Sequence, residues 1–242
     1  MRQLRKLKDL SHFALQARDD EIGKFKEVYF DDESWVVRYL IVHTGGWLIG
    51  REVLISPRHI IGLDDEHKNI RVDLTRKQIK KSPLMDTKKP VSRHYEMEYY
   101  HYFRWESYWW LEPPIAGPVG PPPARPEPPD EPEDPHLRYS KEVRGYQIHA
   151  RDGELGSVDD FVIDDHSWQI NYLVVDIHKW LPGKKVLIAA AWVRNVDWAM
   201  SEIVVELDRE TIQSAPAYDP SEIISYDYEV ELYSHYGKVM KT

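Results

Sequence analysis

The stretch from Trp35 to Val42 is hydrophobic except for Arg38, and its alternate positions place Trp35, Val37, Tyr39 and Ile41 on one face. Successive side chains of a β-strand point to opposite faces, so this spacing predicts a strand that begins at Trp35. The polar run 31–34 before it predicts a turn, because Asp and Ser side chains bond nearby backbone N–H groups. The same turn and strand pattern returns at residues 164–175.

That recurrence belongs to a long internal repeat. Shifting the chain by 133 positions aligns residues 17–100 with residues 150–233 without a gap, and about thirty of these positions are identical. A gapless match of this length indicates a duplication. We therefore expect two similar halves, at residues 1–111 and 137–242.

Further short hydrophobic stretches in each half are separated by Gly and polar residues, which is typical of a β-barrel or β-sandwich. Thr75 and Asp208 are predicted to cap one short helix in each half, and Pro83 and Pro216 to end it. The proline-rich segment 112–136 between the halves is predicted to be an extended spacer, with a ligand for an aromatic groove as the alternative.

Composition limits the functions that the chain can have. It contains no Cys, which excludes disulfides and thiolate chemistry, and no apolar run approaches the 18–20 residues that a membrane span needs. The net charge of −9 argues against a nucleic-acid partner. We expect a soluble, cytoplasmic protein in which the basic runs 2–8 and 76–81 are solvated.

The second half carries the segments "DGELGSVDDFVID", "WLPGKKVLI" and "VVELDRETIQSAP", whose pattern resembles the PRC-barrel domain. That family includes the cytoplasmic domain of the photosynthetic reaction-centre H subunit and a domain of the ribosome maturation factor. The resemblance implies a mainly β fold of two small PRC-barrel-like β-barrels, each with a short helix, in a tandem pseudo-symmetric repeat. It also implies a non-catalytic module that docks on other proteins.

The candidate metal-binding residues are His94, Glu98 and His101. If residues 92–103 are helical, these three side chains share one face, and two imidazoles with a carboxylate can bind Zn or Fe(II). The favoured interpretation is that these residues form the solvent-exposed face of an amphipathic helix. We therefore expect no metal and no cofactor.

Aromatic residues gather just before the spacer, and Trp105, Tyr108, Trp109 and Trp110 are the candidate interaction residues. They can form a groove for a ligand or partner, a platform for a sugar, or a segment that packs on its own chain or between the halves, and this last case is favoured.

These observations predict a non-enzymatic protein-interaction or assembly module with an unidentified protein partner and with its two barrels paired. One alternative is a small-ligand or metal-binding protein, or an enzyme, that uses the aromatic and His cluster at residues 94–110. Another, from the family resemblance, is a factor associated with the ribosome or with a photosynthetic reaction centre.

Overall fold

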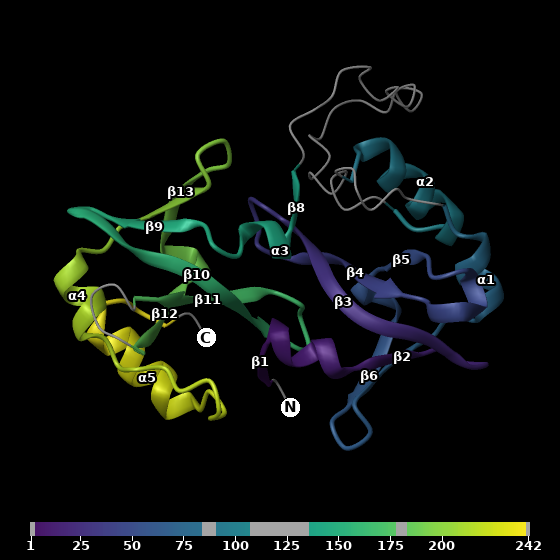
Figure 1. Cartoon of the computed structure of the whole chain (residues 1–242), viewed down its shortest axis with the longest axis horizontal. Coiled ribbons are helices and arrows are strands. Elements are labelled where there is room, and N and C mark those ends of the chain that lie inside the picture. Colours follow the sequence, from purple (N-terminus) through teal and green to yellow (C-terminus); the bar gives the residue numbers. More distant parts are fainter. Residues whose placement is uncertain (1–2, 84–90, 107–135, 178–182, 241–242) are drawn as a thin grey trace, which may run out of the picture.

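The structure is a computed structural model that describes residues 3–83, 91–106, 136–177 and 183–240. Two β-sheets, each of seven strands, lie next to each other along the long axis of the molecule (Figure 1). Helices α1 (Arg76–Lys81) and α2 (Arg93–Phe103) lie at one end, and α4 (Arg209–Ser214) and α5 (Tyr226–His235) lie at the other (Figure 1). The short helix α3 (Ser140–Val143) lies near the middle (Figure 1). Nearly all of the predicted spacer 112–136 lies outside the described residues.

The first half contributes short strands, three 3-10 turns and two α-helices. They are β1 (Leu4–Lys6), η1 (Leu7–His12), β2 (Ala14–Gln16), β3 (Glu21–Asp31), β4 (Val37–His43), η2 (Gly45–Leu48), β5 (Glu52–Ile55), η3 (Pro57–His59), β6 (Ile60–Asp64), β7 (Asn69–Val72), α1 (Arg76–Lys81) and α2 (Arg93–Phe103).

The second half repeats this order with small changes. Its elements are β8 (Leu137–Tyr139), α3 (Ser140–Val143), β9 (Gln147–Ala150), β10 (Gly153–Asp164), β11 (Ile170–Asp176), β12 (Lys185–Ala189), η5 (Ala190–Trp192), β13 (Val193–Asp197), β14 (Glu202–Val205), α4 (Arg209–Ser214) and α5 (Tyr226–His235).

Both sheets have the same strand order, β5-β4-β3-β2-β7-β6 in one and β12-β11-β10-β9-β14-β13 in the other. The registers also agree at an offset of 133 residues: Leu40 pairs with Ile55 on β4 and β5, and Leu173 with Ile188 on β11 and β12. The sequence repeat therefore corresponds to a repeat of strand pairing.

The mainly β class is confirmed, but the described residues do not form the closed barrels that we expected. No pairing joins the two end strands of either sheet within the described part of the chain. Between end strands β5 and β6 the turn η3 begins with Pro57, which has no N–H to donate. The chain changes direction there instead of forming a hairpin.

Two tryptophans shorten strands that the pattern predicted to start with them. Trp35 and Trp168 have left-handed backbones, with φ of 57° and 59°, so β4 and β11 begin two residues later. Such a conformation is unusual for a bulky residue. It turns the Trp35 ring back onto Phe30, with 5.3 Å between the ring centroids.

The predicted helix caps are present. The Thr75 hydroxyl accepts a hydrogen bond from the Gln78 N–H in a capping box, and the Asp208 carboxylate accepts one from the Thr211 N–H. These bonds satisfy backbone donors that have no partner within the helix. Local sequence signals therefore place α1 and α4 correctly.

Gly23 and Gly156 occupy the same point of β3 and β10, where the long strand crosses the end of its neighbour. A Cβ at Gly156 would lie 2.2 Å from the carbonyl oxygen of Asp176, and one at Gly23 would lie 2.0 Å from that of His43. No side chain fits in that space, which explains why the repeat has Gly at both positions.

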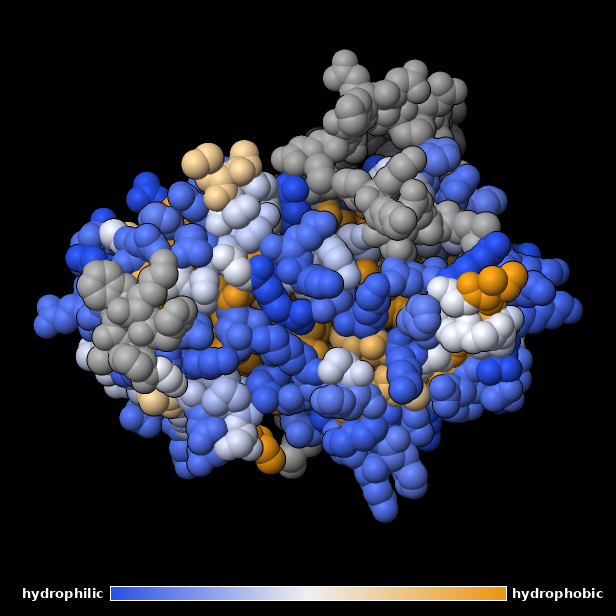
Figure 2. All heavy atoms as spheres, in the orientation of Figure 1, coloured by the Kyte–Doolittle hydropathy of each residue, from blue (hydrophilic) through white to orange (hydrophobic). Residues whose placement is uncertain are grey.

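Hydrophobic side chains from both halves form one continuous core, and a second, smaller core lies beneath α2. The face in Figure 2 is largely hydrophilic, and apolar residues reach it only in small separate patches. Among the described residues, no helix combines the length and the apolar character required to cross a membrane.

Candidate functional site at the junction of the two halves

Each half places its first strand on the sheet of the other half. Strand β1 pairs with β10, with Leu4 opposite Asp164. Strand β8 pairs with β3, with Leu137 opposite Asp31. Both pairs are antiparallel and are related by the 133-residue offset, so the exchange is reciprocal. The expected pairing of the halves is thus present as shared β-structure.

The two halves also bond directly where the left-handed tryptophans meet. The N–H of Val37 donates to the carbonyl of Trp168 at 2.9 Å, and the N–H of Ile170 donates to that of Trp35 at 2.8 Å. The Gln169 amide adds a bond of 2.7 Å to the carbonyl of Ser34. These reciprocal bonds fix the relative position of the two sheets.

An arginine secures each exchanged strand. The Nε of Arg5 lies 2.7 Å from an Asp165 carboxylate oxygen, and its Nη atoms bond both oxygens of Asp65. The Arg5 hydrogen bond lowers the pKa of Asp65. Only 12% of the Arg5 side chain is exposed. The expectation that residues 2–8 carry solvated charge is therefore wrong for Arg5, because β1 adds to a sheet and buries this side chain.

Arg138 has the equivalent role on β8. Its Nε lies 2.8 Å from the Asp32 carboxylate, and its guanidinium lies 4.1 Å from the ring centroid of Trp198. Burial raises the pKa of Asp32 despite this arginine. Asp32 and Asp165 are equivalent positions of the repeat, so each arginine pairs with the same carboxylate of the opposite half. The second contact differs, because Trp198 occupies the position equivalent to Asp65.

Two buried acids face each other across the junction and share Arg144. Glu27 on β3 accepts hydrogen bonds from the hydroxyl of Ser140 at 2.7 Å and from Nη1 of Arg144 at 2.6 Å. Asp160 on β10 has an ion pair with Arg144, at 3.6 Å from Nε, and accepts backbone hydrogen bonds from Phe161 and, at 3.2 Å, from the Lys8 N–H. Glu27, Arg144 and Asp160 are called the acid cluster below.

Asp160 is the less satisfied of the two acids. One of its carboxylate oxygens is buried without a hydrogen bond, as is Nε of Arg144. Burial raises the pKa of Asp160 to about 6, although backbone N–H groups and Arg144 oppose the shift. The repeat positions of Ser140 and Arg144 are Leu7 and Ser11, so Asp160 lacks the donors that Glu27 has.

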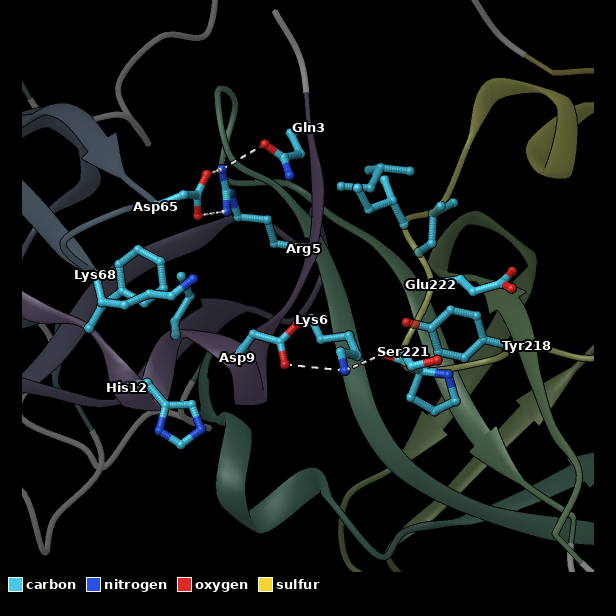
Figure 3. A pocket seen from close by; sticks show the side chains of 16 residues that line it. Gln3, Arg5, Lys6, Asp9, His12, Asp65, Lys68, Tyr218, Ser221 and Glu222 are labelled. Carbon is cyan, nitrogen blue, oxygen red and sulfur yellow. Dashed lines mark hydrogen bonds and ion pairs between the residues drawn. The ribbon is translucent and has the colours of Figure 1, made fainter.

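A pocket of about 370 Å³ lies beside the exchanged strand β1 (Figure 3). Lys6 is ion-paired with Asp9 at 3.1 Å and donates to the carbonyl of Pro220 at 2.6 Å. Figure 3 shows Tyr218 and Glu222 on the opposite wall from Asp65. The pocket therefore lies between the N-terminal segment of the first half and the loop before α5.

The candidate metal residues lie on the outer face of α2. His94 and Glu98 form an exposed ion pair at 3.4 Å, and His101 is also exposed. The described residues contain no group of three or more His, Asp or Glu side chains that could hold a metal ion. The buried face of α2 is occupied by Tyr95, Tyr99 and Tyr100, as the amphipathic-helix interpretation predicts.

Of the candidate interaction residues only Trp105 is described, since Tyr108, Trp109 and Trp110 lie outside the described residues. The half-buried Trp105 ring packs on its own half, 4.5 Å from the ring centroid of His59, and Arg58 lies 5.2 Å from the indole. In the structure Trp105 therefore contributes to packing within the chain.

His59 was not singled out by the sequence. It is buried beneath Trp105, its Nδ1 lies 2.8 Å from Asp73, and its Nε2 has no hydrogen-bond partner. Burial lowers the pKa of His59, with partial compensation by Asp73. The imidazole packs against the rings of Phe103 and Trp105.

The acid cluster and the arginines were also missed. A signal for them exists, because Leu4-Arg5 and Leu137-Arg138 match at the offset of 133, and Glu27 and Asp160 are both acidic at that offset. Acids at the same inward position of two repeats point to a shared polar contact. The match of Leu4-Arg5 with Leu137-Arg138 lies before residue 17, where the aligned block of the repeat begins, so the repeat alone did not draw attention to it.

Comparison with known proteins identifies part of this architecture. No curated protein sequence matches the chain. The sequence model of the PRC-barrel domain matches residues 6–79, which run from the end of β1 into α1. This part of the first half is therefore similar to a PRC-barrel domain.

Proposed function

We propose that the chain is a non-catalytic tandem PRC-barrel protein that acts as an interaction or assembly module for a protein partner. Residues 150–233 would form the second PRC-barrel domain, on the basis of the internal repeat. The shared registers and the reciprocal strand exchange support a pseudo-symmetric pair of domains that behaves as one unit. Such a unit presents surfaces of both domains in a fixed geometry.

The observation that carries the interaction role is an exposed apolar stripe on the second half. Ile223, Tyr226 and Val230 are 76%, 65% and 43% exposed. Single exposed apolar residues are common, but these three lie within eight residues of chain, and a group of exposed apolar side chains is a feature of contact surfaces. The polar groups at the junction, by contrast, mainly bond each other and hold the halves together.

The test is affinity capture from native lysate with the full chain and with Tyr226→Arg/Val230→Met as bait, followed by mass spectrometry. We expect the wild type to recover the same protein in replicate experiments. The recovered protein, mixed with the purified chain, should then form a complex in size-exclusion chromatography. Failure to form any such complex would refute the interaction role. Bound metal or small molecule in the purified chain would favour the ligand-binding alternative instead.

A further inference from the structure

Helix α5 has one buried and one exposed apolar face. Glu229 and Leu232 face its own half, and the Glu229 carboxylate accepts a hydrogen bond from Tyr172 at 2.6 Å. Tyr226 and Val230, four residues apart, lie together on the outward side. Ile223 lies in the segment just before the helix, whose N-cap is Ser225. These three outward residues are called the α5 face.

The fold itself does not require this apolar face. At the offset of 133, Tyr226 and Val230 correspond to Arg93 and Met97 of α2. The inward residues are conserved between the two helices in character, since Glu96 and Glu229 are both buried. The position of Tyr226 therefore tolerates a charge in the first half, and the fold does not require an aromatic side chain there.

Carboxylates border the α5 face. Glu222, Asp227 and Glu231 are all exposed. Residues 216–237 contain five Asp and Glu and no Lys or Arg, whereas the equivalent residues 83–104 contain three acids and four bases. A basic surface is the complement of this region, because opposite charges across an interface steer association and suppress other partners.

The α5 face continues into the junction pocket. Ile223 and Ile224 line that pocket together with Phe13 and Tyr218. In Figure 3, Glu222 and Tyr218 lie on this wall, and Lys6 is already paired with Asp9. An apolar side chain beside a basic one can therefore enter the pocket with its charge next to Glu222.

We propose that the α5 face docks a basic amphipathic segment of a partner protein. Apolar residues of that segment, at helical spacing, lie against Tyr226 and Val230, and one enters the pocket beside Ile223. Its Lys and Arg residues pair with the bordering carboxylates. This inference rests on the proposed interaction role and names the chemistry of the partner. An anionic membrane surface or a nucleic acid would be repelled by the same carboxylates.

The probe is a fluorescein-labelled peptide of about 18 residues with Leu at i, i+3, i+4 and i+7 and Lys elsewhere. A second peptide has Glu in place of Lys. Fluorescence anisotropy is measured with the full chain. We expect the Lys peptide to bind at least about tenfold more tightly than the Glu peptide, and its binding to weaken as salt rises.

Two variants and one control locate the binding. Tyr226→Arg/Val230→Met installs the residues of α2, which suit this helix position, and should weaken Lys-peptide binding about tenfold or more. Asp227→Asn/Glu231→Gln should weaken it less and should flatten the salt dependence. Ile61→Ser removes an apolar side chain that is 62% exposed on β6, and it should leave binding unchanged. Circular dichroism and melting temperatures verify that each variant is folded.

Equal binding of the two peptides, or undiminished binding by the Tyr226→Arg/Val230→Met variant, would overturn the assignment of this face. The capture experiment separates that failure from failure of the interaction role. If wild type and variant recover the same partner, the interaction role stands and the docking surface lies elsewhere. If the Lys peptide binds as expected but no partner forms a complex, the interaction role fails, and with it the assignment of a partner protein to this face, although the face binds basic peptides.

Discussion

Replacing Asp160 by Asn should remove a pH dependence from the stability of the junction. Asp160 is 1% exposed, and the charged groups nearest to it are the guanidinium of Arg144 and the ammonium of Lys8. Glu27 acts on it indirectly, because its carboxylate also pairs with Arg144. Its pKa is about 6 in the folded chain, against the ordinary Asp value of 3.8 that applies to the unfolded chain. Folding therefore increases the affinity of this carboxyl for a proton.

The sign of the effect follows from that increase. Between about pH 4 and pH 6 the folded chain binds more protons at Asp160 than the unfolded chain, so this group lowers stability as pH rises. A shift of about two pH units corresponds to roughly 3 kcal/mol in full. About 2 kcal/mol of this falls between pH 4.5 and pH 7.5, because part of the titration lies below that range. Asn has no charge to desolvate and lacks the dependence.

The assay is urea unfolding followed by Trp fluorescence at several pH values between about 4.5 and 7.5. The quantity of interest is the unfolding free energy of Asp160→Asn minus that of the wild type. We expect it to increase by roughly 2 kcal/mol from the lowest to the highest pH. Taking the difference cancels the titration of groups common to both proteins.

Asp159→Asn is the matched neighbour. Burial disfavours its charge, but Lys185 and Lys8 outweigh this and lower the pKa of Asp159. Its stabilising contribution is present above the ordinary pKa of 3.8 and is lost only as pH falls below it. The difference for Asp159→Asn should therefore stay nearly constant over the assay range, whereas that for Asp160→Asn rises. A difference for Asp160→Asn that stays constant with pH would refute the reasoning.

Two further substitutions test the architecture by urea unfolding. Gly156→Ala should destabilise the chain by about 2 kcal/mol or more, because its Cβ would lie 2.2 Å from the Asp176 carbonyl oxygen. Gly46→Ala, with nothing within 4 Å of its Cβ, should change stability by no more than about 0.5 kcal/mol; equal effects would contradict the steric argument. Arg5→Ala should cost about 3 kcal/mol by leaving Asp165 without its charge partner. Arg194→Ala, 69% exposed, should cost less than about 1 kcal/mol, and a comparable loss there would refute a special role for Arg5.

Much of the local structure could be predicted because its causes are local. The turn before β4, the cap at Thr75 and the helix α2 depend on residues within a few positions of one another. The repeat added information, since both halves had to fit each element. Burial of the tyrosines on one face of α2 likewise leaves His94 and Glu98 outside, as its spacing indicates.

The exchange of β1 and β8 could not be predicted, because its causes are distant in sequence. Strands of three residues are too short to show a period, and Leu4 finds Asp164 only through the packing of both sheets. Arg5 was predicted to be solvent-exposed because its sequence neighbours are basic. Its actual partners, Asp65 and Asp165, lie far along the chain. The left-handed Trp35 is likewise set by its bond across the junction.

The strand exchange has a consequence for synthesis. Arg5 and Asp165 are 160 residues apart, and at about 5–20 residues per second the first waits roughly 8–30 s for the second. During that time β1 has no sheet to join, and the edge of β3 near Asp31 lacks the strand that will cover it. Uncovered edges recruit strands from other chains. A ribosome that stalls before β8 therefore displays an aggregation-prone intermediate, and the risk ends only when the second half emerges.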